Sequence, residues 1–365
     1  MSFIADLQNL GKKPAAKQAE EDKPKPAVIH KDLKDKLKAL DAVNAALNVQ
    51  FKTTNSLVRL GDKIGKPMPS QSTGLPTLDW GVIQCGGLPE GRIIEIFGPE
   101  SAGKTTIALQ FIAQAQEDGN LAAFVDAEHA LDPNQAKLLG VDVNNLVISQ
   151  PDSGEQALDT VIALVDSGAV SLIVVDSVAA LVPRAELEGD MGDSHMGLQA
   201  RLMSQAMRKL VGRCENNKCT VVFINQIREK IGVMYGSNET TTGGRALRFF
   251  ASLRLDIRRK FMQGAPTDAK QVGHWMTIKA VKNKVGSPFQ ETDVYLDYSE
   301  GIDKFGDLVK YCKDMGVIEG TTWLKFEGEN IAQGLEKAKQ VLRENPALMN
   351  KIKAALAKAR AAQTK

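Results

Sequence analysis

Short apolar runs alternate with stretches of helical length through the middle of the chain. Five of these runs have the length and the Val and Ile content of buried strands, and they cover residues 92–97, 122–125, 146–148, 172–175 and 220–224. Enough residues separate consecutive runs for a helical crossover. The pattern predicts an α/β domain with a largely parallel central sheet flanked by helices, which we expect to extend over residues 66–302.

Different patterns precede and follow this predicted core. Residues 11–27 alternate Lys, Glu, Pro and Ala, so residues 1–29 are predicted to form a flexible leader. Residues 30–65 are predicted to hold an amphipathic helix and a connector strand. The helix is expected because apolar residues recur at three- and four-residue steps, namely Leu33, Leu37, Leu40, Val43 and Leu47, and the connector because Gly, Pro and Ser recur from Gly61 onward. The apolar face of this helix either folds back on its own domain or docks on a neighbouring subunit. Residues 303–365 are predicted to form a small α+β lobe with a hairpin near 323–331 and a basic helical tail.

Composition narrows the possible functions only slightly. The chain has 365 residues, of which 43% are apolar and 25% charged, enough for one large core with smaller appended units. It lacks both a run of about 20 apolar residues and the order of a signal peptide, so we expect a cytoplasmic protein without a membrane partner. A net charge of +2 does not by itself indicate nucleic acid. We expect the scattered cysteines to be reduced thiols, namely Cys85, Cys214, Cys219 and Cys312.

Residues 98–105 fit the phosphate-binding P-loop pattern, between a predicted strand and a helix that begins near Lys104. Glycines let backbone N–H groups turn toward phosphates, and the start of a helix adds its positive dipole end. We expect Lys104 to reach the β- and γ-phosphates of ATP and Thr105 to bind Mg²⁺. The predicted nucleotide contacts are Gly98, Pro99, Glu100, Ser101, Ala102, Gly103, Lys104, Thr105 and Thr106.

Three polar residues near strand ends extend this predicted site. Asp176 follows the strand 172–175 and is expected to hold Mg²⁺ together with Thr105, although an Asp in that place can also cap a helix. Glu128 follows the strand 122–125, which we expect to lie next to the P-loop strand, so Glu128 is predicted to activate the attacking water, although its spacing also fits a surface carboxylate. Gln226 follows the strand 220–224 and is suited to sense a γ-phosphate.

Long motifs in a fixed order strongly resemble the bacterial and phage RecA recombinase family. They cover residues 98–105, 125–133, 175–181, 192–210, 223–228 and 240–244, and the similarity extends from about residue 31 to 345. The resemblance implies a RecA-like P-loop fold and an ATP- and Mg²⁺-dependent recombinase. Such a protein polymerises on single-stranded DNA, hydrolyses ATP at subunit interfaces and exchanges strands with homologous duplex DNA.

The resemblance also assigns roles to single residues. It implies that Glu128 activates water and that Gln226 couples ATP to the DNA-binding loops. It places Lys282 and Lys284 against the ATP of an adjacent subunit and favours docking for the helix that begins near Lys31. The residues that it places around the nucleotide base are Asp132, Gln135 and, from the neighbouring subunit, Tyr298.

Two glycine-rich loops, 188–197 and 227–243, are predicted to bind DNA because loops on a rigid scaffold often carry function. Their cations would hold phosphates, and the apolar residues of the second loop either insert between bases or pack in the core. The resemblance also identifies the two segments as DNA-binding loops and implies that Met196 and Ile231 contact stretched base steps. Together the predicted contacts are Met196, Gly197, Arg201, Ser204, Arg208, Arg228, Lys230, Ile231, Met234, Gly243, Gly244 and Arg245. The resemblance maps a second site, for the incoming duplex, to Arg258, Arg259 and Lys279, with Thr277 at a position that is basic in the family.

Two further departures from the family pattern change the expectations. Gln135 stands where the family usually has a tyrosine over the adenine, so we expect looser base selectivity, with comparable turnover of ATP and GTP. Residues 351–365 contain five Lys or Arg and no acid where the family commonly has an acidic tail, so we expect this tail to assist duplex capture. Two alternatives stay open: a hexameric RecA-fold DNA helicase or motor, and a non-enzymatic DNA-coating protein with a structural ATP site.

Overall fold

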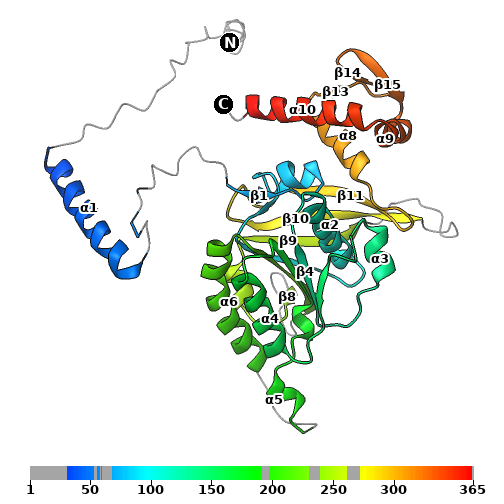
Figure 1. The fold of residues 1–365 in the computed structure, drawn as a ribbon. Helices are drawn as coiled ribbons and strands as arrows, with labels where there is room; N and C mark the ends of the chain where they lie inside the picture. Colours follow the sequence, from blue (N-terminus) through cyan, green and yellow to red (C-terminus); the bar gives the residue numbers. More distant parts are fainter. Residues whose placement is uncertain are drawn as a thin grey trace, which may run out of the picture. The chain divides into compact units, whose positions relative to one another are not determined.

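The computed structural model describes residues 31–52, 56–57, 59, 68–190, 197–229, 239–260 and 272–363. The chain divides into two units, Met1–Lys66 and Pro67–Lys365 (Figure 1). The predicted leader and connector strand, apart from a few residues of 56–59, lie outside the described residues. The boundaries of the predicted domains stay predictions.

The first unit contains helix α1 (Lys31–Phe51), which confirms the helix expected from the apolar spacing. Its apolar stripe is open: Leu33, Leu40 and Val43 are 45%, 54% and 49% exposed. Asn44 holds the chain that follows the helix, because its side-chain amide donates to Leu57 O at 3.0 Å and its Oδ1 accepts from Leu57 N at 2.8 Å. The unit therefore presents an apolar helix face that its described residues leave about half exposed.

The second unit is built around a mostly parallel sheet, as predicted (Figure 1). Strand β3 (Ile93–Gly98) lies at its centre and pairs in parallel with β7 (Thr220–Glu229) on one side and β9 (Leu253–Lys260) on the other. Beyond β7 follow β6 (Leu172–Asp176), β4 (Ala122–Asp126) and β5 (Val147–Ser149), all parallel. Beyond β9 the direction alternates through β10 (Gly273–Asn283), β11 (Glu291–Asp297) and β12 (Gly301–Ile302). Strand β8 (Glu239–Thr241) pairs with the far end of β7.

Helices cover both faces of this sheet (Figure 1). Side chains alternate across β3, so that Ile94 and Ile96 share a core with Ile107 of helix α2 (Lys104–Glu117). Ile93 points to the opposite core, which is formed with α4 (Gly154–Asp166), α6 (Leu198–Asn217) and α7 (Ala246–Phe250). Both faces of the central strands are therefore buried, which explains their continuous apolar sequence.

One strand prediction is wrong in its burial. Residues 146–148 were expected to form a buried strand, but β5 lies at the edge of the sheet, and Val147 and Ile148 are 38% and 51% exposed. A run of apolar residues predicts strand structure without saying where in the sheet the strand lies.

Shorter elements complete the unit. A two-stranded ribbon pairs β1 (Ser70–Gln71) with β2 (Leu88–Pro89), and the π-helical turn η2 (Thr77–Val82) lies between them in the sequence. Helix α3 (Pro133–Leu138) follows β4, while η3 (Val178–Ala180) and α5 (Arg184–Leu187) follow β6.

The C-terminal lobe has its own small core. It contains α8 (Lys304–Asp314), a sheet of β13 (Ile318–Glu319), β14 (Trp323–Phe326) and β15 (Glu329–Gln333), and the helices α9 (Leu335–Glu344) and α10 (Pro346–Gln363). The β14–β15 pair confirms the expected hairpin. Thr77 N donates to Asp307 Oδ2 at 3.0 Å and joins η2 to this lobe.

The basic tail is an integral part of the lobe rather than an appendage. Ile352 and Leu356 are 0% and 6% exposed and belong to its core, whereas Lys351, Lys353 and Lys358 face outward. Near the end of α10, Arg360 stacks over the ring of Trp80 in η2, with Cζ 3.0 Å from the ring centroid. Deleting residues 351–365 would therefore remove core packing together with charge.

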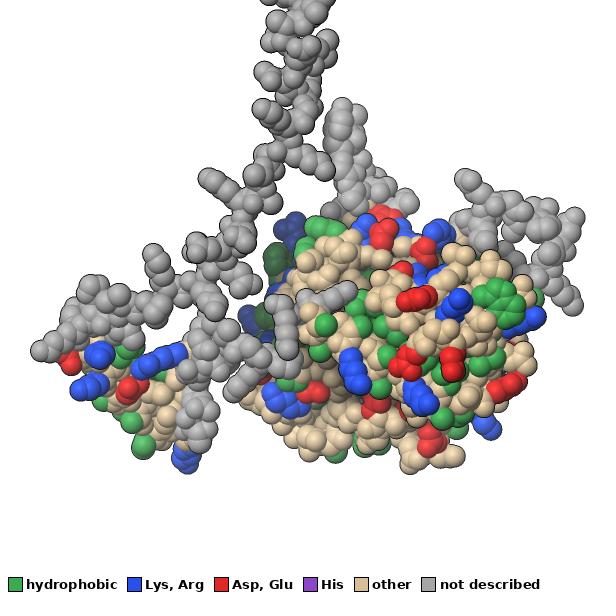
Figure 2. Space-filling view, turned by 90° about the horizontal axis from the view of Figure 1, so that it is seen from above, with side chains coloured by type: hydrophobic (Ala, Val, Ile, Leu, Met, Phe, Trp, Pro, Cys, Tyr) green, Lys and Arg blue, Asp and Glu red, His purple; other side chains and the backbone are tan. Residues whose placement is uncertain are grey.

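Charges of both signs are mixed on the surface. In Figure 2, Lys and Arg side chains lie interspersed with Asp and Glu over the face in view, in keeping with the net charge of +2. None of the helices in the described part of the chain has the length and apolar content needed to span a bilayer.

Candidate nucleotide and DNA site

The P-loop connects the end of β3 to the start of α2, as predicted. A side chain at Gly98 would collide with the carbonyl oxygen of Ile257 in β9, and Gly103 has φ +94° and lies against the sulfur of Met276 in β10. Both positions therefore require glycine. No side chain caps the start of α2. Its first N–H groups thus remain available for an anion such as phosphate.

Two P-loop side chains and Asp176 form a polar cluster. Lys104 Nζ donates to Pro99 O at 2.7 Å, and burial lowers the pKa of Lys104, while Asp176 and Glu128 oppose that shift. Thr105 Oγ1 donates to Asp176 Oδ2 at 2.6 Å. Burial raises the pKa of Asp176 to about 6, although the bond from Thr105 lowers it. Lys104 can therefore leave a neutral carbonyl for a phosphate without breaking an ion pair.

The Thr105–Asp176 pair fits Mg²⁺, because hydroxyl and carboxylate oxygens are its preferred protein ligands and it usually takes only one or two carboxylates. In the part of the chain that the structure describes, no cluster of three or more His, Cys, Asp or Glu could hold a metal without outside ligands. Phosphate oxygens and water would have to supply the remaining ligands.

Glu128 reaches the site from a strand that is not adjacent to the P-loop strand. The expected neighbourhood of these strands is wrong, because β7 and β6 lie between β3 and β4. Glu128 N donates to Asp176 O at 3.3 Å, and its Oε1 accepts hydrogen bonds from Ser177 Oγ and, at 3.1 Å, from Gln226 Nε2. The carboxylate is thus held by groups from two other strands.

Gln226 lies beside the P-loop. It is the register partner of Gly98 where β7 pairs with β3, and its Oε1 accepts from Arg228 Nη2 at 3.5 Å. The same strand continues toward residues 230–238, within the predicted second DNA loop. One strand therefore carries a residue at the nucleotide site and an exposed arginine that starts the candidate DNA segment.

A buried polar network lies on the other face of the sheet, and sequence analysis missed it. Glu95 in β3 is 0% exposed and accepts from Arg254 Nε at 2.5 Å and from Asn225 Nδ2 at 2.9 Å. Asn225 also bonds Thr242 and accepts from Gln226 N at 2.9 Å. A charged residue in the apolar run 92–97 was the available signal, because a buried carboxylate requires a partner.

Several predicted DNA contacts gather beside η3 and the start of α6. Arg201, Ser204 and Arg208 share one face of α6, since they follow one another at three- and four-residue steps. Gly243 and Gly244 lie against Val178 and Ala200, so the end of the second loop packs on the first turn of α6. Arg201, Arg208, Arg228, Gly197 and Arg245 are all exposed. Met196, Lys230, Ile231 and Met234 lie outside the described residues.

The predicted second DNA site lies on strands whose cations bind carboxylates. Arg258 donates to Glu239 at 2.6 and 3.0 Å and to Asp256 at 2.8 and 3.1 Å, and these carboxylates raise its pKa. Lys279 forms an ion pair with Glu291 at 2.8 Å. Arg259 also interacts within the chain. DNA would have to compete with these acids. Thr277 donates to Asp293.

The two lysines expected at a neighbour's ATP differ in their surroundings. Lys282 Nζ donates to the carbonyls of Arg248 and Phe249 at 2.6 and 2.9 Å, at the end of α7. Burial, and then Lys284, lowers the pKa of Lys282. Lys284 is exposed. Lys282 is thus partly buried and occupied by carbonyl groups of its own chain, whereas Lys284 is more exposed.

The residues expected around the nucleotide base lie on one side of the sheet. Gln135 is exposed on α3, and Asp132 caps that helix by accepting from Asn134 N at 2.8 Å. Tyr298 follows β11 and is 47% exposed. Strand β12, which follows it, reaches the residue directly after α3, because a side chain at Gly301 would meet Leu139 Cδ2 at 2.9 Å. Gln135 and Tyr298 therefore belong to adjoining segments of the same chain.

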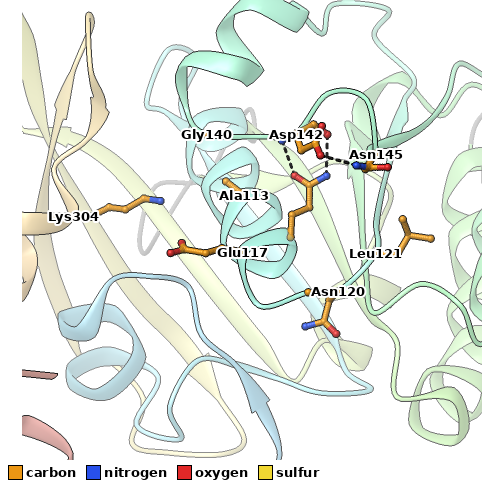
Figure 3. A pocket seen from close by; sticks show the side chains of 10 residues that line it. Ala113, Glu117, Asn120, Leu121, Gly140, Asp142, Asn145 and Lys304 are labelled. Carbon is orange, nitrogen blue, oxygen red and sulfur yellow. Dashed lines mark hydrogen bonds between the residues drawn. The ribbon is translucent and has the colours of Figure 1, made fainter. Parts of the chain in front are cut away.

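A separate cavity of about 600 Å³ lies at the opposite end of α2 from the P-loop (Figure 3). Glu117 and Lys304 point into it, and Asp142 N donates to Gln116 Oε1 at 2.9 Å along its wall. Helix α2 has 14 residues and is thus about 21 Å long. The distance excludes this cavity from the phosphate-binding site.

A P-loop at the centre of a mostly parallel sheet, with a carboxylate and a glutamine facing it, defines a P-loop nucleotide-binding α/β protein. The RecA N-terminal domain family matches residues 38–303 and the RecA C-terminal domain family matches residues 306–360. The chain belongs to the RecA family of DNA recombinases.

Individual relatives agree with this membership. Protein RecA of Streptomyces venezuelae is 54% identical over 323 residues, covering 87% of this chain and 83% of its own length. Protein RecA of Mycobacteroides abscessus is 53% identical over 323 residues, which cover 87% of this chain and 91% of that protein. Among solved structures, the RadB recombinase matches with a TM-score of 0.49 and 20% identity over 64% of this chain and 98% of its own.

Proposed function

We propose that the chain is a DNA-dependent ATPase that polymerises on single-stranded DNA and uses Mg²⁺ and ATP to exchange strands with a homologous duplex. The observation that carries this proposal is the hydrogen bond from Gln226 Nε2 to Glu128 Oε1 at 3.1 Å. It connects the carboxylate at the nucleotide site to a strand that continues into the candidate DNA loop. Family membership supports a recombinase and does not favour a ring-shaped helicase.

Each polar residue at the P-loop has a step that it can perform. Lys104 exchanges Pro99 O for phosphate oxygens, which are far better partners for a cation. Thr105 and Asp176 would hold Mg²⁺, whose charge stabilises the developing negative charge on the phosphates. Glu128 orients water and accepts its proton.

Coupling to DNA follows from the shared acceptor on Glu128. Its Oε1 accepts from both Ser177 and Gln226, so Gln226 helps to hold the carboxylate in place. A bound γ-phosphate would offer Gln226 a second anionic acceptor, which would compete with Glu128 and draw the amide toward it. That movement frees the base for water and shifts the start of the DNA loop through β7.

The site also suggests where the base of the nucleotide binds. We assign Tyr298 to the nucleotide of its own chain rather than to that of a neighbour. Strand β12, which follows it, meets Leu139 directly after α3, the helix that carries Gln135, and Met276 in β10 lies against Gly103 of the P-loop. In a filament, the exposed Lys284 would then be the contribution from the adjacent subunit.

Steady-state ATP hydrolysis with and without single-stranded DNA tests the proposal. Lys104→Ala should lower turnover about 100-fold or more, because transition-state charge loses a fixed cation. Gln226→Ala should retain basal hydrolysis and lose most of the stimulation by DNA. Equal stimulation of wild type and Gln226→Ala would contradict the proposed coupling.

Gln340→Ala provides the matched control. Gln340 Nε2 donates to Glu344 Oε1 at 2.9 Å on α9, so this variant removes the same kind of Gln–Glu bond away from the P-loop. It should behave as wild type. Absence of hydrolysis in the wild-type protein at saturating DNA and Mg²⁺ would refute the ATPase assignment itself.

A further inference from the structure

A histidine outside all the predicted sites contacts the predicted aromatic residue of the base site. His274 in β10 lies 3.0 Å through Nδ1 from the hydroxyl of Tyr298, and the ring centroids are 5.6 Å apart at an interplanar angle of 51°. His274 is 9% exposed. Tyr298 is fixed at a second point, because its backbone N donates to Val272 O at 2.8 Å. The exposed tyrosine is thus anchored at both ends.

The protonation state of His274 suits this role. Burial, and then the charge of Arg259, lowers its pKa, so the imidazole is neutral near pH 7. A neutral imidazole has one donor and one acceptor nitrogen, and a tyrosine hydroxyl can both donate and accept, so the bond forms in either tautomer. Within the described residues, Nε2 has no hydrogen-bond partner. The contact with Tyr298 is therefore the polar interaction that the structure shows for this buried ring.

The location of the pair connects it to the P-loop. His274 and Met276 lie on the same buried face of β10, two residues apart and hence about 7 Å along the strand. Met276 in turn lies against Gly103. The His274–Tyr298 pair therefore occupies the face of the sheet on which the phosphates would bind.

We infer that His274 is the positioning residue that holds Tyr298 against the nucleotide base and thereby sets base affinity in this chain. The inference rests on the proposed function, because it takes Tyr298 as a wall of the base site. Gln135 supplies no aromatic ring at the other base position. The orientation of Tyr298 then governs how well a purine ring can stack there.

A double-mutant cycle tests the inference, using KM and kcat for ATP and GTP together with equilibrium binding of a fluorescent ATP analogue. His274→Ala and Tyr298→Phe should each raise KM and the dissociation constant about fivefold with kcat unchanged, as expected for one neutral hydrogen bond. The double variant should be no worse than His274→Ala, because both single changes remove the same bond. Additive effects would overturn the inference, as would an unchanged dissociation constant in His274→Ala.

Two further variants separate positioning from stability. His274→Asn keeps a polar atom near the place of Nδ1 and should recover most of the affinity. Tyr295→Phe removes a hydroxyl from β11, where the ring contacts Trp275 with centroids 5.3 Å apart, and should bind nucleotide as wild type does. If Tyr295→Phe lost as much nucleotide affinity as Tyr298→Phe, the loss would come from a general disturbance of this edge of the sheet, and the inference about His274 would be wrong. The proposed function is tested by a different result: if the wild-type protein shows no DNA-stimulated ATP hydrolysis, the proposed function itself fails, whatever the variants do.

Discussion

Single buried acids define how this protein should respond to pH. Asp79 in η2 is 3% exposed and accepts from Ser72 Oγ at 2.7 Å and from Thr73 N at 3.0 Å. Burial nevertheless raises its pKa from 3.8 to about 7, and Asp307 adds repulsion. Burial likewise raises the pKa of Asp307 to about 6. Both acids lie where the core meets the C-terminal lobe, because Asp307 bonds Thr77 of η2.

The free energy of unfolding should therefore decrease as pH rises from about 4 to about 7. Unfolded chains lose the Asp79 proton near the ordinary pKa of 3.8, whereas the folded chain keeps it until about 7. The folded state then binds more protons between these values, so the stabilisation is complete below 3.8 and is lost as pH rises through 7. Denaturant unfolding at several pH values should show this slope in wild type and a flatter one in Asp79→Asn. The exposed Asp159→Asn should keep the wild-type slope, and an identical slope in all three proteins would contradict the prediction.

Residues of local motifs could be predicted from sequence, and residues that meet across the sheet could not. The P-loop is eight consecutive residues, so its pattern alone indicated its place between β3 and α2. Ser177 and Asn225 look like ordinary polar residues after apolar runs. Their roles depend on Glu128 and Glu95, which are 49 and 130 positions away. Only the order of the strands brings these pairs together.

Elements show the same division between type and position. The predicted strands formed, but the sequence carried no signal for the edge position of β5 or for the two strands that separate β4 from β3. Strand order depends on how crossovers pack over the sheet, which local periodicity does not record. Glu128 therefore lies beside Asp176 and Gln226, although β4 is not the neighbour of the P-loop strand that we expected it to be.

Helix α10 combines packing and charge on different faces, and substitutions can separate them. Replacing Lys351, Lys353 and Lys358 by Ala should leave thermal unfolding unchanged and weaken duplex DNA binding several-fold at low salt, since these side chains face outward. Leu356→Ala should instead destabilise the lobe by about 2–4 kcal/mol, because it opens a cavity in its core. Binding titrations at several salt concentrations measure the first effect.

The control for this prediction removes three exposed lysines elsewhere in the lobe, Lys313, Lys325 and Lys337. This variant has the same net charge as the α10 variant. If both variants bind duplex DNA equally weakly, the net charge of the lobe determines duplex binding, and the lysines of α10 have no specific role in it.

At the scale of the whole molecule, self-association should depend on α1. Val43→Glu places a charge on the apolar stripe, and since Val43 is 49% exposed in the single chain, thermal stability should not change. We expect assembly on single-stranded DNA with a slowly hydrolysed ATP analogue to weaken at least about tenfold, which corresponds to 1.4 kcal/mol. Light scattering and electron microscopy measure assembly.

Ala45→Glu is the matched control, because position 45 lies about 200° around the helix from position 43 and is exposed. It should assemble as wild type does. Full-length filaments formed by Val43→Glu would show that the stripe serves another purpose.

Strand β7 also limits how this sequence can change over evolutionary time. Gln226 and Arg228 share a face only because they are two residues apart, and Gln226 lies opposite Gly98 only in the present register. Inserting or deleting one residue between Asn225 and Arg228 would turn alternate side chains toward the wrong layer. Single substitutions can therefore be accepted here over evolution. A change in the length of this segment would instead break the connection between the candidate nucleotide site and the candidate DNA loop.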